Sequence, residues 1–293
     1  MRSQENAAYI GTDDRLLAAW IHSSVLNGGH GESDIQKSCS VQIRPEDIDP
    51  HILSLRVYVP AIAADMRMKE EVRRAEKLFF DASVKGVMDV LYTYVYVRIV
   101  ARLMRIIPLV PLTPNQITIG YLFIAAGAFM AYAQGQWALG LALSAFTMIC
   151  DAWDGVLARL TFQSSRLGHW LDKVSHSIYH PLWYVAIAYH LGAGMVWSWP
   201  MVNAVALVFL FFIMKPITIR YNRRYGRSIY DTSDLNRKLR LFSGTRWNMN
   251  MILMGIGLGM DMFTESFYFI TLYGFLSVCY WITQYYLMPS NHK

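Results

Sequence analysis

Three aspartates and a histidine interrupt the apolar residues between positions 150 and 180. Asp151 and Asp154 are three residues apart, and Asp172 and His176 are four apart. On helices the members of each pair share one face. Unpaired carboxylates in an apolar segment are costly, whereas carboxylates that converge on a divalent cation are neutralised. A hairpin over residues 160–167 would bring the two pairs together, so the spacing predicts a metal site at the ends of two helices.

The sequence around this site indicates helices in a membrane. Of the 293 residues, 54% are hydrophobic and only 16% are charged. Six apolar blocks follow one another, and each can lengthen into a helix that crosses the bilayer. They are residues 117–133, 137–150, 177–194, 195–214, 247–260 and 267–288. We therefore predict an all-α integral membrane protein with a bundle of six transmembrane helices.

Lysine and arginine are distributed unevenly over the connections between these blocks. The short connections near residues 135 and 193 carry no charge, and the one over residues 261–265 carries only acidic side chains. The basic residues lie instead in the connection over residues 159–173 and in the next one, residues 215–246. By the positive-inside rule, the basic connections, both termini and the metal site are expected to be cytoplasmic. The net charge of +6 is thus a signal of membrane topology and gives no reason to expect nucleic acid.

The chain before the first apolar block divides into two regions. Residues 1–65 are mixed and polar, and we expect a small cytoplasmic region of unknown role, with a helix over residues 13–26 and strands near 40–44 and 53–59.

Residues 66–110 have a helical pattern that is broken or bent near Gly86. Arg98, Arg102 and Arg105 share one face of this segment, which predicts an amphipathic helix that lies in the membrane interface or docks on the protein itself. Thr113 is expected to cap the first transmembrane helix, so that residues 111–293 form the membrane domain.

The polar residues of the opening stretch also form a motif. It reads Asp151-x2-Asp154-Gly155-x2-Ala158-Arg159-x8-Gly168-x3-Asp172-x3-His176. This closely resembles the signature D-x2-D-G-x2-A-R-x8-G-x3-D-x3-D of the CDP-alcohol phosphotransferases. Every fixed position matches except the last, where the family has aspartate and this chain has His176.

The resemblance implies a membrane transferase of phospholipid or polar-lipid synthesis, which moves a phosphoalcohol group from a CDP-linked donor to an acceptor alcohol and releases CMP. It also implies one or two Mg²⁺ or Mn²⁺ ions, which would offset the charge of the diphosphate. By the family pattern the metal ligands are Asp151, Asp154, Asp172 and His176. The residues expected to bind the CDP donor are Asn115, Thr118, Gly155, Ala158, Arg159 and Gly168.

His176 leaves three interpretations open. An imidazole can ligate a metal and can accept a proton, so His176 and Asp172 are candidates for the base of an active enzyme. The active enzyme is the leading interpretation. The alternatives are an engineered or weakened variant of the enzyme and, after that, a non-catalytic protein that binds lipid or nucleotide on the same scaffold. A zinc site made by Asp172, His176 and His180 is a further alternative, but it leaves Asp151 and Asp154 unexplained.

The acceptor and the partners are less well defined. Arg220, Arg223 and Arg224 follow the fourth apolar block and suit an acceptor that carries phosphate, although membrane topology alone also accounts for them. The donor is either CDP-diacylglycerol or a soluble CDP-alcohol. We also expect a homodimer, as the family resemblance implies, in which the glycines at positions 255, 257 and 259 allow close packing.

Overall fold

The computed structural model describes residues 68–105, 112–161, 163 and 166–287, together with five short strands nearer the N-terminus. Residues 1–82 and 83–293 form two compact units.

The first unit contains the strands and most of one helix. Strand β1 (Ala7–Ile10) pairs antiparallel with β2 (Leu16–Trp20) and parallel with β3 (Val41–Ile43), and β4 (His51–Ile52) pairs antiparallel with β5 (Val57–Tyr58). The strand predicted near 40–44 is confirmed by β3. Of the strand predicted over 53–59, β5 covers Val57 and Tyr58, and the remaining residues lie outside the described part of the chain. The predicted helix over residues 13–26 is wrong, because β2 occupies its centre and takes its backbone partners from β1. Helix α2 (Lys69–Ser83) follows.

The second unit begins where the helical pattern breaks. No helix or strand occurs between Ser83 and Asp89, in agreement with the break predicted near Gly86. Helical structure resumes after Asp89 as the π-helical stretch η3 (Tyr92–Tyr96) and continues as α3 (Val97–Leu103). The Asp89 carboxylate accepts a hydrogen bond from the backbone N–H of Tyr92 at 3.0 Å, so this aspartate caps the new helix.

Six helices then form a bundle, and each covers all or most of one of the predicted apolar blocks. They are α4 (Pro114–Ala133), α5 (Trp137–Leu160), α6 (Arg166–Leu191), α7 (Trp199–Tyr225), α9 (Trp247–Gly259) and α10 (Phe263–Leu287). Thr113 caps α4 as predicted, in a reciprocal capping box with Gln116. The short helices η4 (Ile229–Asp231) and α8 (Asp234–Leu241) lie in the basic connection between α7 and α9.

Within the described residues, four helices are long and apolar enough to cross a membrane: α4, α5, α7 and α10. Helix α6 has 26 residues but begins with charged side chains, and α9 has only 13 residues. Large apolar side chains are exposed on the bundle, among them Phe123, Val205 and Phe209, as expected of surfaces that face lipid. The apolar helices indicate a membrane protein.

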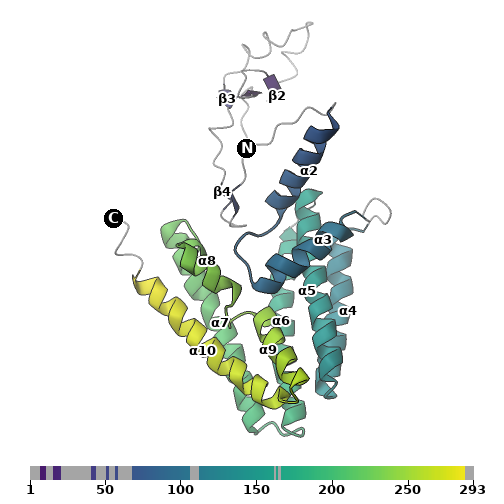
Figure 1. Ribbon diagram of the computed structural model, residues 1–293, viewed down its shortest axis with the longest axis vertical. Helices are drawn as coiled ribbons and strands as arrows, with labels where there is room; N and C mark the ends of the chain where they lie inside the picture. The colour runs from purple at the N-terminus through teal and green to yellow at the C-terminus, as the bar shows by residue number, and fades with distance from the viewer. Residues whose placement is uncertain are drawn as a thin grey trace. The chain divides into compact units, whose positions relative to one another are not determined.

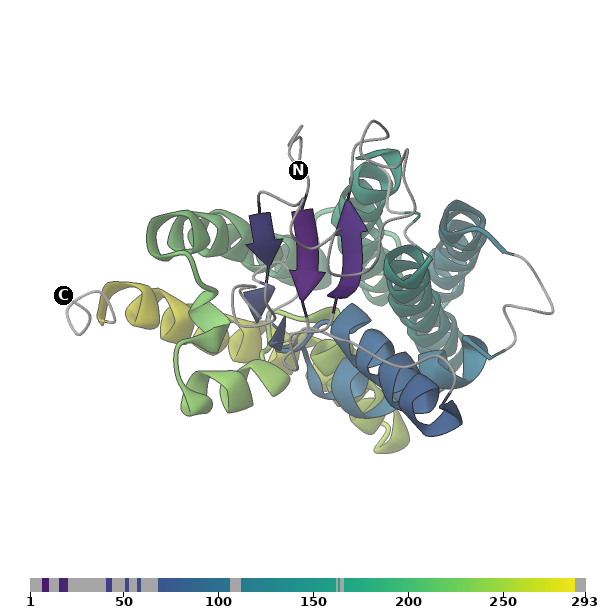
Figure 2. The same ribbon diagram turned by 90° about the horizontal axis from the view of Figure 1, so that it is seen from above.

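Helix α4 packs closely against both α5 and α6. Helices α4 and α5 run side by side (Figures 1 and 2). Gly140 lies against the ring of Tyr132, where an added Cβ would be 2.5 Å from a ring carbon. Trp183 of α6 is fully buried, and its indole donates to the Ala125 carbonyl of α4 at 2.9 Å. The α4–α5, α6–α7 and α9–α10 turns lie at one end of the bundle, and the α5–α6 connection lies at the other (Figure 1).

Candidate functional site

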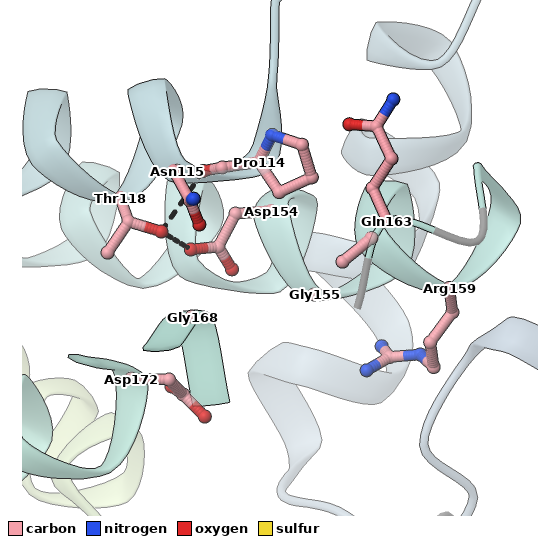
Figure 3. A pocket seen from close by; sticks show the side chains of 10 residues that line it. Pro114, Asn115, Thr118, Asp154, Gly155, Arg159, Gln163, Gly168 and Asp172 are labelled. Atoms are coloured by element: carbon pink, nitrogen blue, oxygen red, sulfur yellow. Dashed lines mark hydrogen bonds between the residues drawn. The ribbon is translucent and has the colours of Figure 1, made fainter. Parts of the chain in front are cut away.

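A pocket opens between the start of α4, the last turns of α5 and the first turns of α6 (Figure 3). Its lining consists of Pro114, Asn115, Thr118, Asp154, Gly155, Ala158, Arg159, Gln163, Gly168 and Asp172. All six residues expected to bind the CDP donor are in this lining. The hairpin between α5 and α6 therefore brings the two halves of the motif together, as the spacing predicts.

Asp154 is tied to α4 within this pocket. It is 7% exposed, and its Oδ2 accepts a hydrogen bond of 2.5 Å from the buried hydroxyl of Thr118 (Figure 3). The same hydroxyl also lies 3.1 Å from the Pro114 carbonyl oxygen. A threonine hydroxyl has one proton, so the bond to the carboxylate and the bond to the helix backbone compete for it.

The other three polar residues of the motif form a cluster, which we call the Asp151–Asp172–His176 trio. One potential ligand atom from each residue lies within 4.8 Å of the others. The imidazole lies between the two carboxylates, with Nε2 3.3 Å from Asp151 Oδ2 and Nδ1 3.6 Å from Asp172 Oδ1. The hydroxyl of Tyr179 is 3.1 Å from Nδ1 and orients the ring.

The trio has the properties of a cation site. Asp151 Oδ1 is buried and has no hydrogen-bond partner among the described residues. A buried carboxylate oxygen without a donor is costly, and a divalent cation would satisfy it. The two carboxylates suit Mn²⁺ or Mg²⁺, and the imidazole suits a transition-metal ion. Of the four predicted metal ligands, the structure gathers three, whereas Asp154 bonds to Thr118 instead.

His180 does not belong to the trio. Both of its ring nitrogens are buried without a partner in the described part of the chain. Its ring packs against Tyr179, Trp183 and Trp247, with the Trp247 ring stacked 5.7 Å away. These contacts are those of a core histidine.

Comparison with known proteins assigns the family. A model of the CDP-alcohol phosphatidyltransferase family matches residues 111–281, which is more than half of the chain. The chain belongs to the CDP-alcohol phosphatidyltransferase family. It is thus a membrane transferase of phospholipid synthesis. No curated protein matches the chain significantly.

Solved structures with the same fold include the phosphatidylinositol phosphate synthase PgsA1 of Mycobacterium tuberculosis. The form with CDP-DAG bound has 16% identity and a TM-score of 0.51, covering 67% of this chain and 98% of that one. The form in complex with manganese and citrate has 16% identity and a TM-score of 0.50, covering 66% and 92%.

Basic side chains border the site of this transferase. Arg159 lines the pocket, and its Nε donates to the Ser83 carbonyl at 2.5 Å. Gly155 leaves room for this guanidinium, because an added Cβ would lie 3.3 Å from both terminal nitrogens. The structure therefore links the arginine of the motif to the segment that precedes η3.

Lys85, which the sequence analysis missed, is a second cation near the trio. Burial lowers the pKa of its ammonium group, while the Asp151 and Asp172 carboxylates favour the charged form and raise it. Lys85 lies between α2 and η3, outside the motif, and no spacing in the sequence relates it to the carboxylates.

The predicted acceptor arginines lie apart from the pocket lining. Arg220, Arg223 and Arg224 are exposed on the last turns of α7. A different cation of α7 contacts the start of α6. Lys215 donates to Ser177 Oγ at 2.7 Å, and Ser177 is next to His176 in sequence. The sequence analysis missed this contact as well, because it used Lys215 only as one of the basic residues that predict the membrane orientation.

Proposed function

We propose that the protein transfers the phosphoalcohol group of a CDP-linked lipid, such as CDP-diacylglycerol, to an acceptor alcohol and releases CMP. One observation carries the proposal. Asp172 lines the donor pocket and also belongs to the Asp151–Asp172–His176 trio, so the nucleotide pocket and the candidate metal site share a carboxylate. The related synthase that binds CDP-DAG supports a lipid donor.

In this proposal the pocket holds the CDP moiety. Asn115 and Thr118 contact it from α4, while Gly155, Ala158 and Gly168 leave room for the cytidine. Arg159 pairs with the diphosphate, since a guanidinium binds phosphate oxygens with two parallel hydrogen bonds.

The candidate metal ligands are Asp151, Asp154, Asp172 and His176, and one or two Mg²⁺ or Mn²⁺ ions would offset the negative charge on the diphosphate. The related synthase in complex with manganese supports a divalent ion.

The reaction requires one bond to form and one to break. The acceptor hydroxyl oxygen forms a bond to the phosphorus that carries the alcohol, and the bond from that phosphorus to the bridging oxygen breaks. CMP departs with the electron pair, and the hydroxyl proton passes to His176 or Asp172. Arg159 offsets the charge that develops on the leaving CMP.

We further propose the membrane arrangement and the partners. All six bundle helices cross the bilayer, the amphipathic segment over residues 66–110 lies in the interface, and both termini and the site face the cytoplasm. Arg220, Arg223 and Arg224 attract a phosphorylated acceptor to the cytoplasmic end of the bundle.

In the same proposal the protein is a homodimer. Gly255 and Gly259 support this, because an added Cβ at either would meet no described atom within 4 Å, whereas Gly257 already packs against Ser266 within the chain.

Release of CMP from the purified full chain tests the function. The chain is supplied with Mn²⁺ or Mg²⁺, CDP-diacylglycerol or soluble CDP-alcohols, and a panel of free and phosphorylated alcohols. We expect turnover that Asp172→Asn abolishes and that Asp234→Asn, a change at an exposed residue of α8, leaves intact. Cytidine-nucleotide binding without turnover on any donor would instead identify a non-catalytic binding protein.

A further inference from the structure

The ligand atoms of the Asp151–Asp172–His176 trio are sufficient for one ion. Two carboxylates and one imidazole converge within 4.8 Å. The remaining carboxylate of the motif, Asp154, is directed to Thr118 by a hydrogen bond of 2.5 Å (Figure 3). A pair of ions a few ångströms apart needs several bridging oxygens, and an imidazole nitrogen cannot bridge two ions as a carboxylate does.

The surroundings of His176 are those of a metal-bound histidine. Such a histidine has its second ring nitrogen held by another protein group, which fixes the tautomer and the ring orientation. Here the Tyr179 hydroxyl lies 3.1 Å from Nδ1, and Nε2 points to Asp151, 3.3 Å from its Oδ2. The unpartnered Oδ1 of the same aspartate is buried beside it.

We propose that the chain binds a single divalent ion through Asp151, Asp172 and the Nε2 atom of His176, and that this mixed ligand set favours Mn²⁺ over Mg²⁺. The preference follows from ligand chemistry, because Mg²⁺ is bound by oxygen whereas imidazole suits transition metals. This inference rests on the proposed function for the presence of a metal. It assigns Nε2 of His176 to the ion, so the hydroxyl proton passes to Asp172, which also lines the donor pocket. A carboxylate has two oxygens, so Asp172 can hold the ion with one and receive the proton with the other.

Electron paramagnetic resonance of Mn²⁺ tests the inference without turnover. Mn²⁺ is titrated into the purified full chain, produced without a histidine tag, and the free ion is counted. Electron spin-echo modulation of the bound ion then reports whether a nitrogen nucleus coordinates it. We expect one Mn²⁺ per chain, with nitrogen modulation from one imidazole, and displacement only by a large excess of Mg²⁺.

Two substitutions on α6 sharpen the result. His176→Asp should remove the nitrogen modulation, lower the preference for Mn²⁺ over Mg²⁺ several-fold and allow a second ion to bind, because a carboxylate adds charge and oxygen ligands. His180→Phe, one helical turn away and among aromatic rings, should keep the modulation.

Three outcomes are decisive on the wild-type chain alone. Two ions per chain, or one ion without nitrogen modulation, overturn the inference and leave the proposed transferase in place. No bound Mn²⁺ would overturn both the inference and the metal dependence of the proposed function.

Discussion

At the scale of single residues, the hydroxyl of Thr118 decides where the Asp154 carboxylate points. Both side chains are buried, and their hydrogen bond joins α4 to α5 in the lining of the pocket proposed to bind the donor. A buried carboxylate oxygen that loses its donor costs about 1–3 kcal/mol.

We expect Thr118→Val, which keeps the shape and removes the donor, to lower the melting temperature in detergent by ~2–12 °C, at about 2–4 °C per kcal/mol for a domain of this size. It should also weaken CMP binding measured by calorimetry, because Asp154 is no longer held in the pocket. Thr118→Ser keeps the hydroxyl and should remain close to the wild type in both measurements. If the serine and valine variants behave alike, the hydrogen bond does not position Asp154.

The spacing of polar residues predicted the site only in part. It placed Asp151, Asp172 and His176 on facing helix ends, because the periodicity of a helix and a short hairpin determine that arrangement. It could not predict that Asp154 turns to Thr118, since the rotamer depends on how closely α4 approaches α5. Lys85 gave no signal, because its neighbours in space lie more than sixty residues further along the sequence.

At the scale of elements, Asp89 connects the start of η3 to the start of α9. Its carboxylate is fully buried. Oδ1 accepts from the Tyr92 N–H at 3.0 Å and from Asn248 Nδ2 at 2.8 Å, and Oδ2 lies 3.3 Å from Arg246 Nη2. The tyrosine at position 96, one turn later, donates to Asn248 Oδ1 at 3.3 Å. One carboxylate therefore contacts both the start of η3 and the part of α9 on which η3 packs.

We expect Asp89→Asn to destabilise this connection. The amide has one acceptor oxygen where the carboxylate has two, so its NH₂ group must face either Arg246 or Asn248, both of which are donors. Removing one partner of a buried ion pair costs about 3–5 kcal/mol. Arg246 retains 33% of its side-chain exposure, so we expect about 2 kcal/mol, seen as a lower melting temperature in detergent.

Hydrogen exchange should localise the effect to residues 90–97. The matched control is Asp81→Asn, because Asp81 is exposed on α2. Equal melting temperatures for the two variants would contradict a structural role for Asp89.

The elements themselves were predictable where the sequence pattern is long. All six apolar blocks became helices, because runs of apolar residues of this length leave few alternatives. The region before them was not predictable in the same way. The segment at β2 is short and apolar, and whether such a segment forms a strand or a helix depends on the partner strand, which lies elsewhere in the sequence.

At the scale of the whole membrane unit, the connections without basic residues lie at one end of the bundle, and the basic α5–α6 connection lies at the other. The α4–α5, α6–α7 and α9–α10 turns share one end of the bundle, and they belong to connections that carry no basic residue (Figure 1). The α5–α6 connection, which carries part of the donor pocket, lies at the other end. The positive-inside rule predicts that this end, and with it the proposed chemistry, faces the cytoplasm.

Cysteine labelling tests this orientation. Gln136 lies in the α4–α5 turn and Gln163 lies in the α5–α6 connection, and both side chains are exposed. The native background is suited to labelling in intact cells. Cys150 is buried, and Cys39 belongs to the region expected in the cytoplasm. Cys279 is exposed, but it lies in the C-terminal half of α10, which ends on the expected cytoplasmic side. In intact cells, a membrane-impermeant maleimide should label Gln136→Cys and should leave both the wild type and Gln163→Cys unlabelled. After permeabilisation Gln163→Cys should react as well, and CMP should protect it because this residue lines the donor pocket. Labelling of Gln163→Cys in intact cells, with Gln136→Cys protected, would reverse the orientation and place the pocket outside, away from a cytoplasmic supply of CDP-linked donor.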